Sequence, residues 1–462
     1  MPRHALLVLV AAVAACAVMP AAAMASASQV MTFEAPEVLD DGARDRTLDE
    51  IRAFGVTSLR TLVYWKSTAP SPDSRTRPDF DASDPAAYPA GTWDRYDRLL
   101  DAAAARGIDV RLTPTGGAPR WATRGRRDNL TEPSPAEFGR FVTALGRRYR
   151  DRVSVWSIWN EPNQPQFLLP QFKRGRAFSP GHYRRLFAAA QSALRATGNG
   201  QDTILLGETS PRGNANIVAP LAFLRGTLCL DRRYRRARSC SRLDVDGWAH
   251  HAYTTSAGPS FVPPKRDDVT IGVLSRLVRA LDRAARARAI PARLGVHLTE
   301  FGVQSRPDRI IGVPQSVQPV YMAIAERIAY RNPRVRAFSQ YLMRDDQPRP
   351  SRLGRYSGFE SGLRDARGRQ KPAYDAFPLP LVADRRGSRV SLWGRVRPAV
   401  GPTTVTVEYD DGGSRWRVLA QRSTDRRGTW QLSSRARGGR RYRVRWTPPG
   451  GASLTGPPIR QS

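Results

Sequence analysis

One segment decides the fold that the sequence predicts: Val153-Ser-Val-Trp-Ser-Ile-Trp-Asn160-Glu161-Pro162-Asn163. It is a short run of β-branched and aromatic residues that ends on an acid, and a proline follows at once. Apolar runs of this length between chain-breaking residues indicate buried parallel strands. Because it costs free energy to desolvate a carboxylate, packing alone does not explain an acid at the end of such a strand.

A second segment repeats this pattern far downstream. It reads Leu294-Gly-Val-His-Leu-Thr-Glu300-Phe-Gly302, so its apolar run ends on Glu300 and a glycine stands two residues later. Hydrolysis of a glycosidic bond needs a pair of carboxyl groups on either side of that bond. Glu161 and Glu300, each at the end of a buried strand, fit this requirement.

Strand-like and helix-like segments alternate around these two acids, from about residue 29 to residue 380. Strands are predicted at residues 30–33, 56–65, 108–113, 153–159, 203–207, 245–249, 293–299 and 337–342. Helices are predicted at residues 93–106, 179–196, 273–288 and 317–331. The capping boxes Thr47-Leu-Asp-Glu50 and Ser134-Pro-Ala-Glu137 predict the starts of two more.

Repeated strand–helix units predict a parallel sheet. Eight strand candidates favour a closed (β/α)8 barrel, over residues 28–380, rather than an open doubly wound sheet. No glycine-rich phosphate loop follows any of the strands, which counts against a nucleotide-binding sheet. The fold class is therefore α/β.

The pattern changes after Pro378-Leu-Pro380. Short strands with alternating residues are predicted at 389–397, 404–409, 416–422, 429–433 and 441–446, with a hairpin turn at Asp410-Asp-Gly-Gly413. In the last strand Tyr442, Val444 and Trp446 would face a core while the intervening arginines face water. Residues 383–462 are thus expected to form a small Ig-like β-sandwich, either as a stabilising appendage or as a glycan-binding module.

The chain is strongly basic, with 74 Lys and Arg against 41 Asp and Glu and a formal charge of +33. Nearly all of the basic residues are arginine, and they are spread along the whole chain. A nucleic-acid-binding protein would show a clustered basic patch or a known reading module, and the sequence has neither. Two explanations stay open: a coding bias, or an acidic glycan or anionic cell surface as partner.

The first 27 residues resemble a secretory signal peptide. A short basic start precedes an uncharged apolar run at residues 5–15, and small-residue cleavage sites follow at Ala23-Met-Ala25 and Ala25-Ser-Ala27. We therefore expect a secreted protein. The alternative is a lipoprotein anchored through Cys16, because Val13-Ala-Ala-Cys16 resembles a lipoprotein cleavage box. The apolar run is too short for a stable membrane span, and no other stretch could form a transmembrane segment.

Two cysteines remain after the signal peptide, Cys229 and Cys240. In a secreted chain this pair suggests one disulfide that closes the arginine-rich loop between them. Two free thiols are the alternative. A metal pair is disfavoured because no histidine lies close by in the sequence.

Several motifs, in order, resemble the clan A retaining glycoside hydrolases, especially families 39 and 5. They are Ser58-Leu-Arg60, Trp159-Asn160-Glu161-Pro162, His251-Ala-Tyr253, Thr299-Glu300-Phe301-Gly302, and the segment from Gly362 to Lys371-Pro-Ala-Tyr374. The resemblance covers roughly residues 30–380. Each motif alone is weak, but their common order makes the resemblance specific.

The resemblance implies that Glu161 is the acid/base and Glu300 the nucleophile. Arg60, Asn160, His251 and Tyr253 would bind substrate or support these acids, and neither a metal nor another cofactor is needed. Three aromatic residues could stack on sugar rings or simply pack in the core: Trp65, Trp121 and Tyr341.

The chain departs from the family at the eighth strand, where many relatives carry a tryptophan and this sequence reads Ser339-Gln-Tyr341. The expected substrate is a β-linked poly- or oligosaccharide. The alternative function is a non-catalytic glycan-binding or cell-surface polysaccharide assembly protein on the same barrel. Two carboxylates argue against it, because binding alone does not need them.

Overall fold

The computed structural model describes residue 26 and residues 28–351, 354–413 and 415–461. Cys16 and almost all of the expected signal peptide lie outside the described residues. Within them, no helix is long and apolar enough to cross a membrane.

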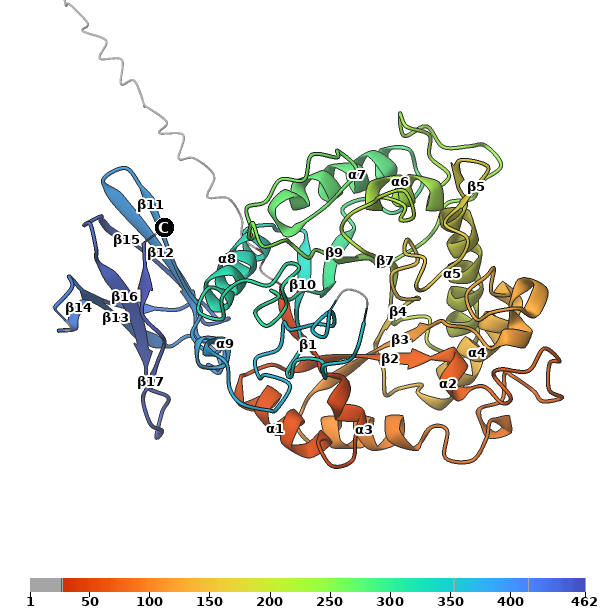
Figure 1. Cartoon of the computed structure of the whole chain (residues 1–462), viewed down its shortest axis with the longest axis horizontal. Coiled ribbons are helices and arrows are strands. Elements are labelled where there is room, and N and C mark those ends of the chain that lie inside the picture. Colours follow the sequence, from red (N-terminus) through yellow and green to blue (C-terminus); the bar gives the residue numbers. More distant parts are fainter. Residues whose placement is uncertain (1–25, 27, 352–353, 414, 462) are drawn as a thin grey trace, which may run out of the picture.

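Eight parallel strands close into a barrel, in the order β1-β10-β9-β8-β7-β4-β3-β2 (Figure 1). Their bounds are β1 Val30–Glu34, β2 Ser58–Tyr64, β3 Asp109–Thr115, β4 Val155–Ser157, β7 Thr203–Thr209, β8 Gly247–His251, β9 Gly295–Glu300 and β10 Val335–Tyr341. Each overlaps one of the predicted strands, so the barrel prediction is confirmed. A small hairpin of β5 Phe172–Lys173 and β6 Arg176–Ala177 lies in the connection after β4.

The helices surround the barrel (Figure 1). They are α1 Arg44–Ala53, α2 Trp65–Thr68, α3 Asp94–Ala104, α4 Pro135–Arg148, α5 Ser179–Ala196, α6 Pro220–Thr227, α7 Leu274–Arg286, α8 Gln318–Tyr330 and α9 Pro372–Ala376. Short 3-10 helices cover Pro36–Leu39, Pro85–Ala87, Arg120–Ala122, Arg124–Arg126 and Ile271–Val273.

The two predicted capping boxes have different outcomes. The Ser134 hydroxyl accepts the backbone N–H of Glu137 at 3.3 Å, and α4 begins at Pro135 as expected. The prediction at Thr47 is wrong, because α1 begins three residues earlier, at Arg44. A turn fixes that earlier start: the backbone N–H of Arg44 donates to the carbonyl of Asp40 at 2.8 Å.

The main hydrophobic core lies between the strands and the surrounding helices. Large aromatic residues dominate it near the acid-bearing strand. Trp159 packs edge-on against Phe138 of α4, with ring centroids 5.0 Å apart, and this contact fixes the backbone just before Glu161. The Tyr183 hydroxyl of α5 donates to the carbonyl of Ile158 and accepts the N–H of Gly207, each at 2.9 Å. The helix α5 therefore ties the ends of β4 and β7 together.

The C-terminal region has its own core between two antiparallel sheets. One sheet contains β11 Leu381–Arg386, β12 Arg389–Arg395 and β15 Thr429–Arg435; the other contains β13 Thr404–Asp410, β14 Arg417–Ser423, β16 Arg441–Trp446, β17 Leu454–Thr455 and β18 Ile459–Arg460. The predicted alternation in β16 is confirmed, since Tyr442, Val444 and Trp446 are buried. The strand β11 was not predicted, and it starts two residues before the expected boundary at 383.

The β-sandwich docks against α8 and α9 (Figure 1). Arg397 makes a two-pronged ion pair with Glu326 of α8, at 2.7 and 2.6 Å, and Arg395 donates to the same carboxylate at 3.2 Å. The Arg427 guanidinium donates to the carbonyl of Gln29, just before β1 begins. These contacts lie at the end of the barrel where the strands start.

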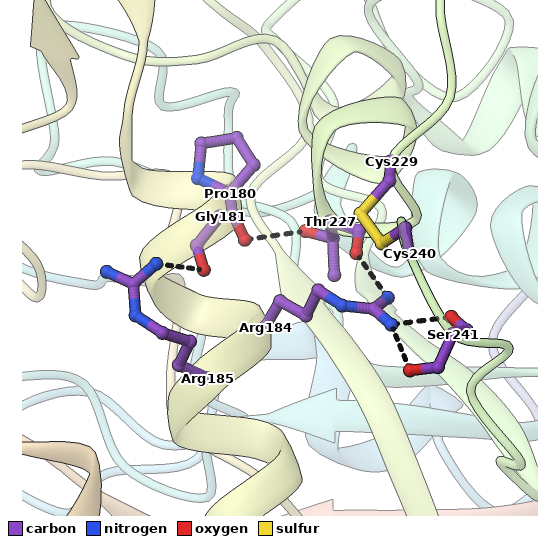
Figure 2. The surroundings of a disulfide bond; sticks show 8 residues. All are labelled: Pro180, Gly181, Arg184, Arg185, Thr227, Cys229, Cys240 and Ser241. Atoms are coloured by element: carbon purple, nitrogen blue, oxygen red, sulfur yellow. Dashed lines mark hydrogen bonds between the residues drawn. A yellow bond between two sulfur atoms is a disulfide. The ribbon is translucent and has the colours of Figure 1, made fainter. Parts of the chain in front are cut away.

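Cys229 and Cys240 form the predicted disulfide (Figure 2). Arg184 of α5 reaches across to both sides of the closed loop. Its guanidinium donates to the carbonyl of Thr227 at 3.0 Å and to the carbonyl of Ser241 at 2.6 Å (Figure 2). The disulfide loop is thereby held against the outer helices.

Candidate active site

The acids singled out from the sequence meet at the carboxyl end of the barrel. Glu300 is the last residue of β9, His251 is the last residue of β8, and Glu161 follows β4. Carboxyl ends of parallel strands share one rim of a barrel, which is where barrel enzymes carry their active sites. One oxygen of Glu161, one oxygen of Glu300 and Nδ1 of His251 all lie within 4.8 Å of one another.

Arg60 of β2 is the hub of the cluster. Its Nη1 donates to Glu300 Oε1 at 2.7 Å and also to Glu34. Its Nη2 donates to Asn160 Oδ1 and to Glu208 Oε2, each at 2.8 Å. Burial alone would lower the pKa of Arg60, but the charges of the three acids raise it well above its usual value. The side chain is thus a fixed, buried cation within the cluster.

Glu161 has a partner for each of its oxygens. Oε1 lies 2.9 Å from Nδ1 of His251, and Oε2 accepts a hydrogen bond from Nε2 of Gln164 at 2.5 Å. Burial raises the pKa of Glu161 above its ordinary value and outweighs the neighbouring His251, which acts to lower it. A carboxyl group in this setting keeps its proton to a higher pH than an exposed glutamate does.

Glu300 is held by two donors. Arg60 supplies one, and the Tyr253 hydroxyl donates to Oε2 at 3.2 Å. The ring of Tyr253 is fixed in turn by stacking on Phe301, with centroids 6.3 Å apart. Arg60 and Tyr253 therefore fix the position of the Glu300 carboxyl group.

Glu208 of β7 is fully buried within the cluster, with no exposed surface. It accepts hydrogen bonds from Ser157, Arg60 and His251. Burial would raise the pKa of Glu208, but the Arg60 charge and the His251 hydrogen bond prevail and lower it to about 2. This carboxylate is a permanent counter-charge that orients Arg60 and His251.

The two adjacent histidines have opposite surroundings. His250 is in the core, where its ring nitrogens bond Thr209 and the carbonyl of Val269, and burial lowers its pKa to about 4. Burial would lower the pKa of His251 as well, but Glu300, Glu161 and Glu208 raise it to about 10. His251 is therefore a buried imidazolium between acids.

The three candidate sugar-stacking aromatics are not brought together. Trp65 and Trp121 are 1% and 4% exposed and pack on each other at 6.3 Å, within the core around α4. Neither offers a free ring face, so their predicted role in substrate stacking is not supported. Tyr341 instead lies at the rim, half-buried, with its ring 4.9 Å from Phe359 and 6.4 Å from Tyr253.

Glu34 is an acid of the cluster that the sequence analysis did not name. It ends β1 and pairs in register with Arg60 on one side and Tyr341 on the other. Burial raises its pKa to about 8 despite the adjacent Arg60. The signal was present in the sequence, because Val30-Met-Thr-Phe-Glu34 is also an apolar strand that ends on an acid.

The group of Glu161, His251 and Glu300 also has the spacing of metal ligands. Its chemistry does not favour a metal ion. His251 is a cation that hydrogen-bonds Glu161, and the Arg60 guanidinium already contacts Glu300. A divalent cation would have to displace the proton of His251 and sit beside a second positive charge.

Comparison with solved structures agrees with this architecture. A family 39 glycoside hydrolase from Bacteroides cellulosilyticus WH2 superposes with a TM-score of 0.52 at 16% identity, covering 88% of this chain and 79% of that one. The chain has the fold of family 39 glycoside hydrolases.

Two further members of that family lie at the same level of similarity. The family 39 enzyme from Xanthomonas axonopodis pv. citri has a TM-score of 0.50 at 15% identity, covering 91% of this chain and 93% of that one. A family 39 β-xylosidase from Caulobacter crescentus has a TM-score of 0.50 at 16% identity, covering 91% and 95%. No family model and no curated protein matches the sequence.

Proposed function

We propose that the protein is a secreted retaining glycoside hydrolase that cleaves a β-linked poly- or oligosaccharide. The observation that carries this proposal is the short separation of Glu161 and Glu300, whose nearest oxygens lie within 4.8 Å. Carboxyl groups are about 5–5.5 Å apart in retaining enzymes and about 6.5–9.5 Å apart in inverting ones. A water molecule therefore has no room between the acids and the sugar in the first step.

The first step uses the two acids in opposite protonation states. Glu161, with its raised pKa, gives its proton to the glycosidic oxygen as the bond to the anomeric carbon breaks. Glu300 attacks the anomeric carbon and forms a covalent glycosyl ester. Arg60 and Tyr253 hold its carboxylate in place for this attack.

In the second step, Glu161 takes a proton from water and the hydroxide oxygen attacks the anomeric carbon. The ester bond breaks, and Glu300 leaves as a carboxylate that Arg60 stabilises. Asn160 has a separate part. Its Oδ1 is occupied by Arg60, so its Nδ2 is left to donate to the sugar 2-hydroxyl, a contact that strengthens in the transition state.

Hydrolysis of a panel of p-nitrophenyl β-glycosides and β-glucans tests this proposal. We expect Glu161→Ala and Glu300→Ala to lose most of the turnover, and the exposed Asp79→Ala to keep it as a matched control. Azide added to the Glu300→Ala variant should yield a glycosyl azide of inverted configuration, because the small anion replaces the missing nucleophile. Full activity in either glutamate variant would overturn the assigned role, and a wild type that binds glycans without hydrolysing them would overturn the function.

Secretion is tested separately. The mature protein should begin near residues 26–28, which mass spectrometry of the intact secreted chain measures. If the chain instead begins at a Cys16 that carries a diacylglycerol group, the protein is a lipoprotein and the proposal of a soluble secreted form is wrong.

A further inference from the structure

Glu34 differs from the other three acids of the candidate active site in its hydrogen bonding. Both oxygens of Glu161, Glu208 and Glu300 have hydrogen-bond partners. Glu34 uses only Oε2, on Arg60, and among the described residues nothing bonds its Oε1. Glu34 is 4% exposed, and its Oε1 is not among the fully buried atoms without partners, so this oxygen keeps some accessible surface. It is a hydrogen-bonding position that the protein leaves for a ligand.

The place of Glu34 in the barrel says which part of a ligand it would meet. It lies on β1, next to Arg60 and Tyr341, whereas Glu161 follows β4 across the barrel. The leaving group is on the Glu161 side, because the acid protonates the leaving oxygen. Glu34 therefore faces the glycone, the sugar that becomes attached to Glu300. A carboxyl group there can hydrogen-bond a sugar hydroxyl, whether it carries its proton or not.

The leaving-group side has a cavity of about 440 Å³. Gln164, which bonds Glu161, lines it. The loops after β7 and β8 supply the other walls. The volume lies in the usual range of about 300–1,000 Å³ for ligand pockets. Phe261, Pro263 and Pro264 give the cavity an apolar face on which a sugar ring can pack.

Two cations line this cavity, and neither forms a direct ion pair among the described residues, although both act electrostatically on the buried Asp268. Arg212 has no hydrogen bond or ion pair within the described part of the chain, and Lys265 bonds only the carbonyl of Gly213, at 3.0 Å. The neighbouring Arg225, in contrast, is paired with Asp267. The one acid in the lining, Asp268, is 4% exposed and accepts the N–H of Gly213 at 2.9 Å. The accessible side chains are therefore positive.

We propose that the site binds a glycan at two positions: a sugar whose hydroxyl is bonded by Glu34 in the glycone position, and an anionic sugar beside Arg212 and Lys265 in the leaving-group position. This inference rests on the proposed hydrolase function. It assigns the two cations of the cavity to one subsite and to one class of ligand, a sugar that carries a carboxylate or a comparable anionic group.

Transglycosylation tests the leaving-group half. The p-nitrophenyl β-glycoside that turns over fastest supplies the covalent intermediate, and methyl β-glucuronide competes with methyl β-glucoside as acceptor. Each exposed ion pair contributes up to about 1 kcal/mol, so two should favour the anionic acceptor by roughly fivefold or more at low salt. The preference should shrink as salt rises to 1 M, because dissolved ions then screen charges that lie more than about 3 Å apart.

The double variant Arg212→Gln/Lys265→Gln should abolish this preference, whereas Arg52→Gln, an exposed and unpaired arginine of α1, should retain it. The measured quantity is a ratio of two products from one reaction, so a partly inactive variant still gives an answer. Equal use of both acceptors by the wild type, or an unchanged ratio in the double variant, overturns this half. If the wild type hydrolyses none of the p-nitrophenyl β-glycosides, the proposed function itself is overturned.

The glycone half has its own measurement. The wild type should hydrolyse a p-nitrophenyl β-glycoside roughly tenfold faster, in kcat/KM, than the deoxy analogue that lacks the hydroxyl bonded by Glu34, which corresponds to about 1.4 kcal/mol. Glu34→Ala should remove this rate difference, because it removes the bonding oxygen. A merely structural role would lower all these rates together. A rate difference that persists unchanged in Glu34→Ala overturns the assignment.

Discussion

The contact between the barrel and the β-sandwich gives a sharp stability prediction. Glu326→Gln removes the charge that pairs with Arg397 and Arg395, whose side chains are 5% and 14% exposed. Loss of one partner from a buried ion pair costs about 3–5 kcal/mol, because the remaining charge stays desolvated. The docked state should be weakened by about that amount.

The thermal consequence depends on how the molecule unfolds. The unfolding entropy is about 2.1 cal/mol/K per residue. If all of the chain melts as one unit, about 4 kcal/mol lowers Tm by only about 4 °C. If the sandwich of roughly 80 residues melts alone, the same loss lowers its Tm by more than about 20 °C, and a separate early transition appears.

Differential scanning calorimetry of the wild type and Glu326→Gln distinguishes these cases. The pH dependence has a definite sign. Burial would raise the pKa of Glu326, but Arg397 and Arg395 lower it, so its contribution is present above the ordinary glutamate pKa of about 4.3 and is lost as pH falls through the lower, folded value. The pH 7 difference between wild type and variant should therefore disappear in acid. A Tm within 1 °C of wild type at pH 7 would refute the reasoning.

Three further outcomes are expected. The kcat/KM should fall as pH rises through the raised pKa of Glu161. Gln164→Ala should move this fall in the pH profile to higher pH, because the Gln164 hydrogen bond favours the ionised form of Glu161. A fall that moves to lower pH would contradict this. Replacing both Cys229 and Cys240 by serine should lower the free energy of unfolding in urea by about 2–3 kcal/mol, and a reducing agent should then have no additional effect. Incubation with EDTA should leave activity intact, because the donor atoms of Glu161, His251 and Glu300 are already engaged by protons and by Arg60; activity restored only by an added metal would contradict the assignment.

The sequence predicted the barrel well because its strands are short, apolar and bounded by breakers. Thr203, where β7 begins, and Arg441, where β16 begins, both stand where the pattern placed them. Capping was less reliable. Thr47 has the right neighbours for a cap, but the turn at Asp40 starts the helix earlier, and a local motif carries no information about a preceding turn.

The active site was only partly visible for a different reason. Glu161 and Glu300 have family motifs around them, whereas Glu34 has only the general pattern of an acid after an apolar strand. Aromatic residues were the least predictable. Trp65 follows a barrel strand just as a sugar-stacking residue would, and only the presence of Phe138 and Phe141 on α4 decides that it packs inward. Such contacts join segments that are distant in the sequence.

The sandwich meets the barrel where the strands begin, as the Arg427 contact with Gln29 shows, while the charged cluster lies where they end. The two ends of the barrel can therefore evolve separately. Insertions and substitutions in the loops after β7 and β8 can alter which glycan is accepted without disturbing the surface that holds the two domains together. Conversely, a change of appended domain would leave the chemistry intact, so one barrel of this kind can be recombined with different modules.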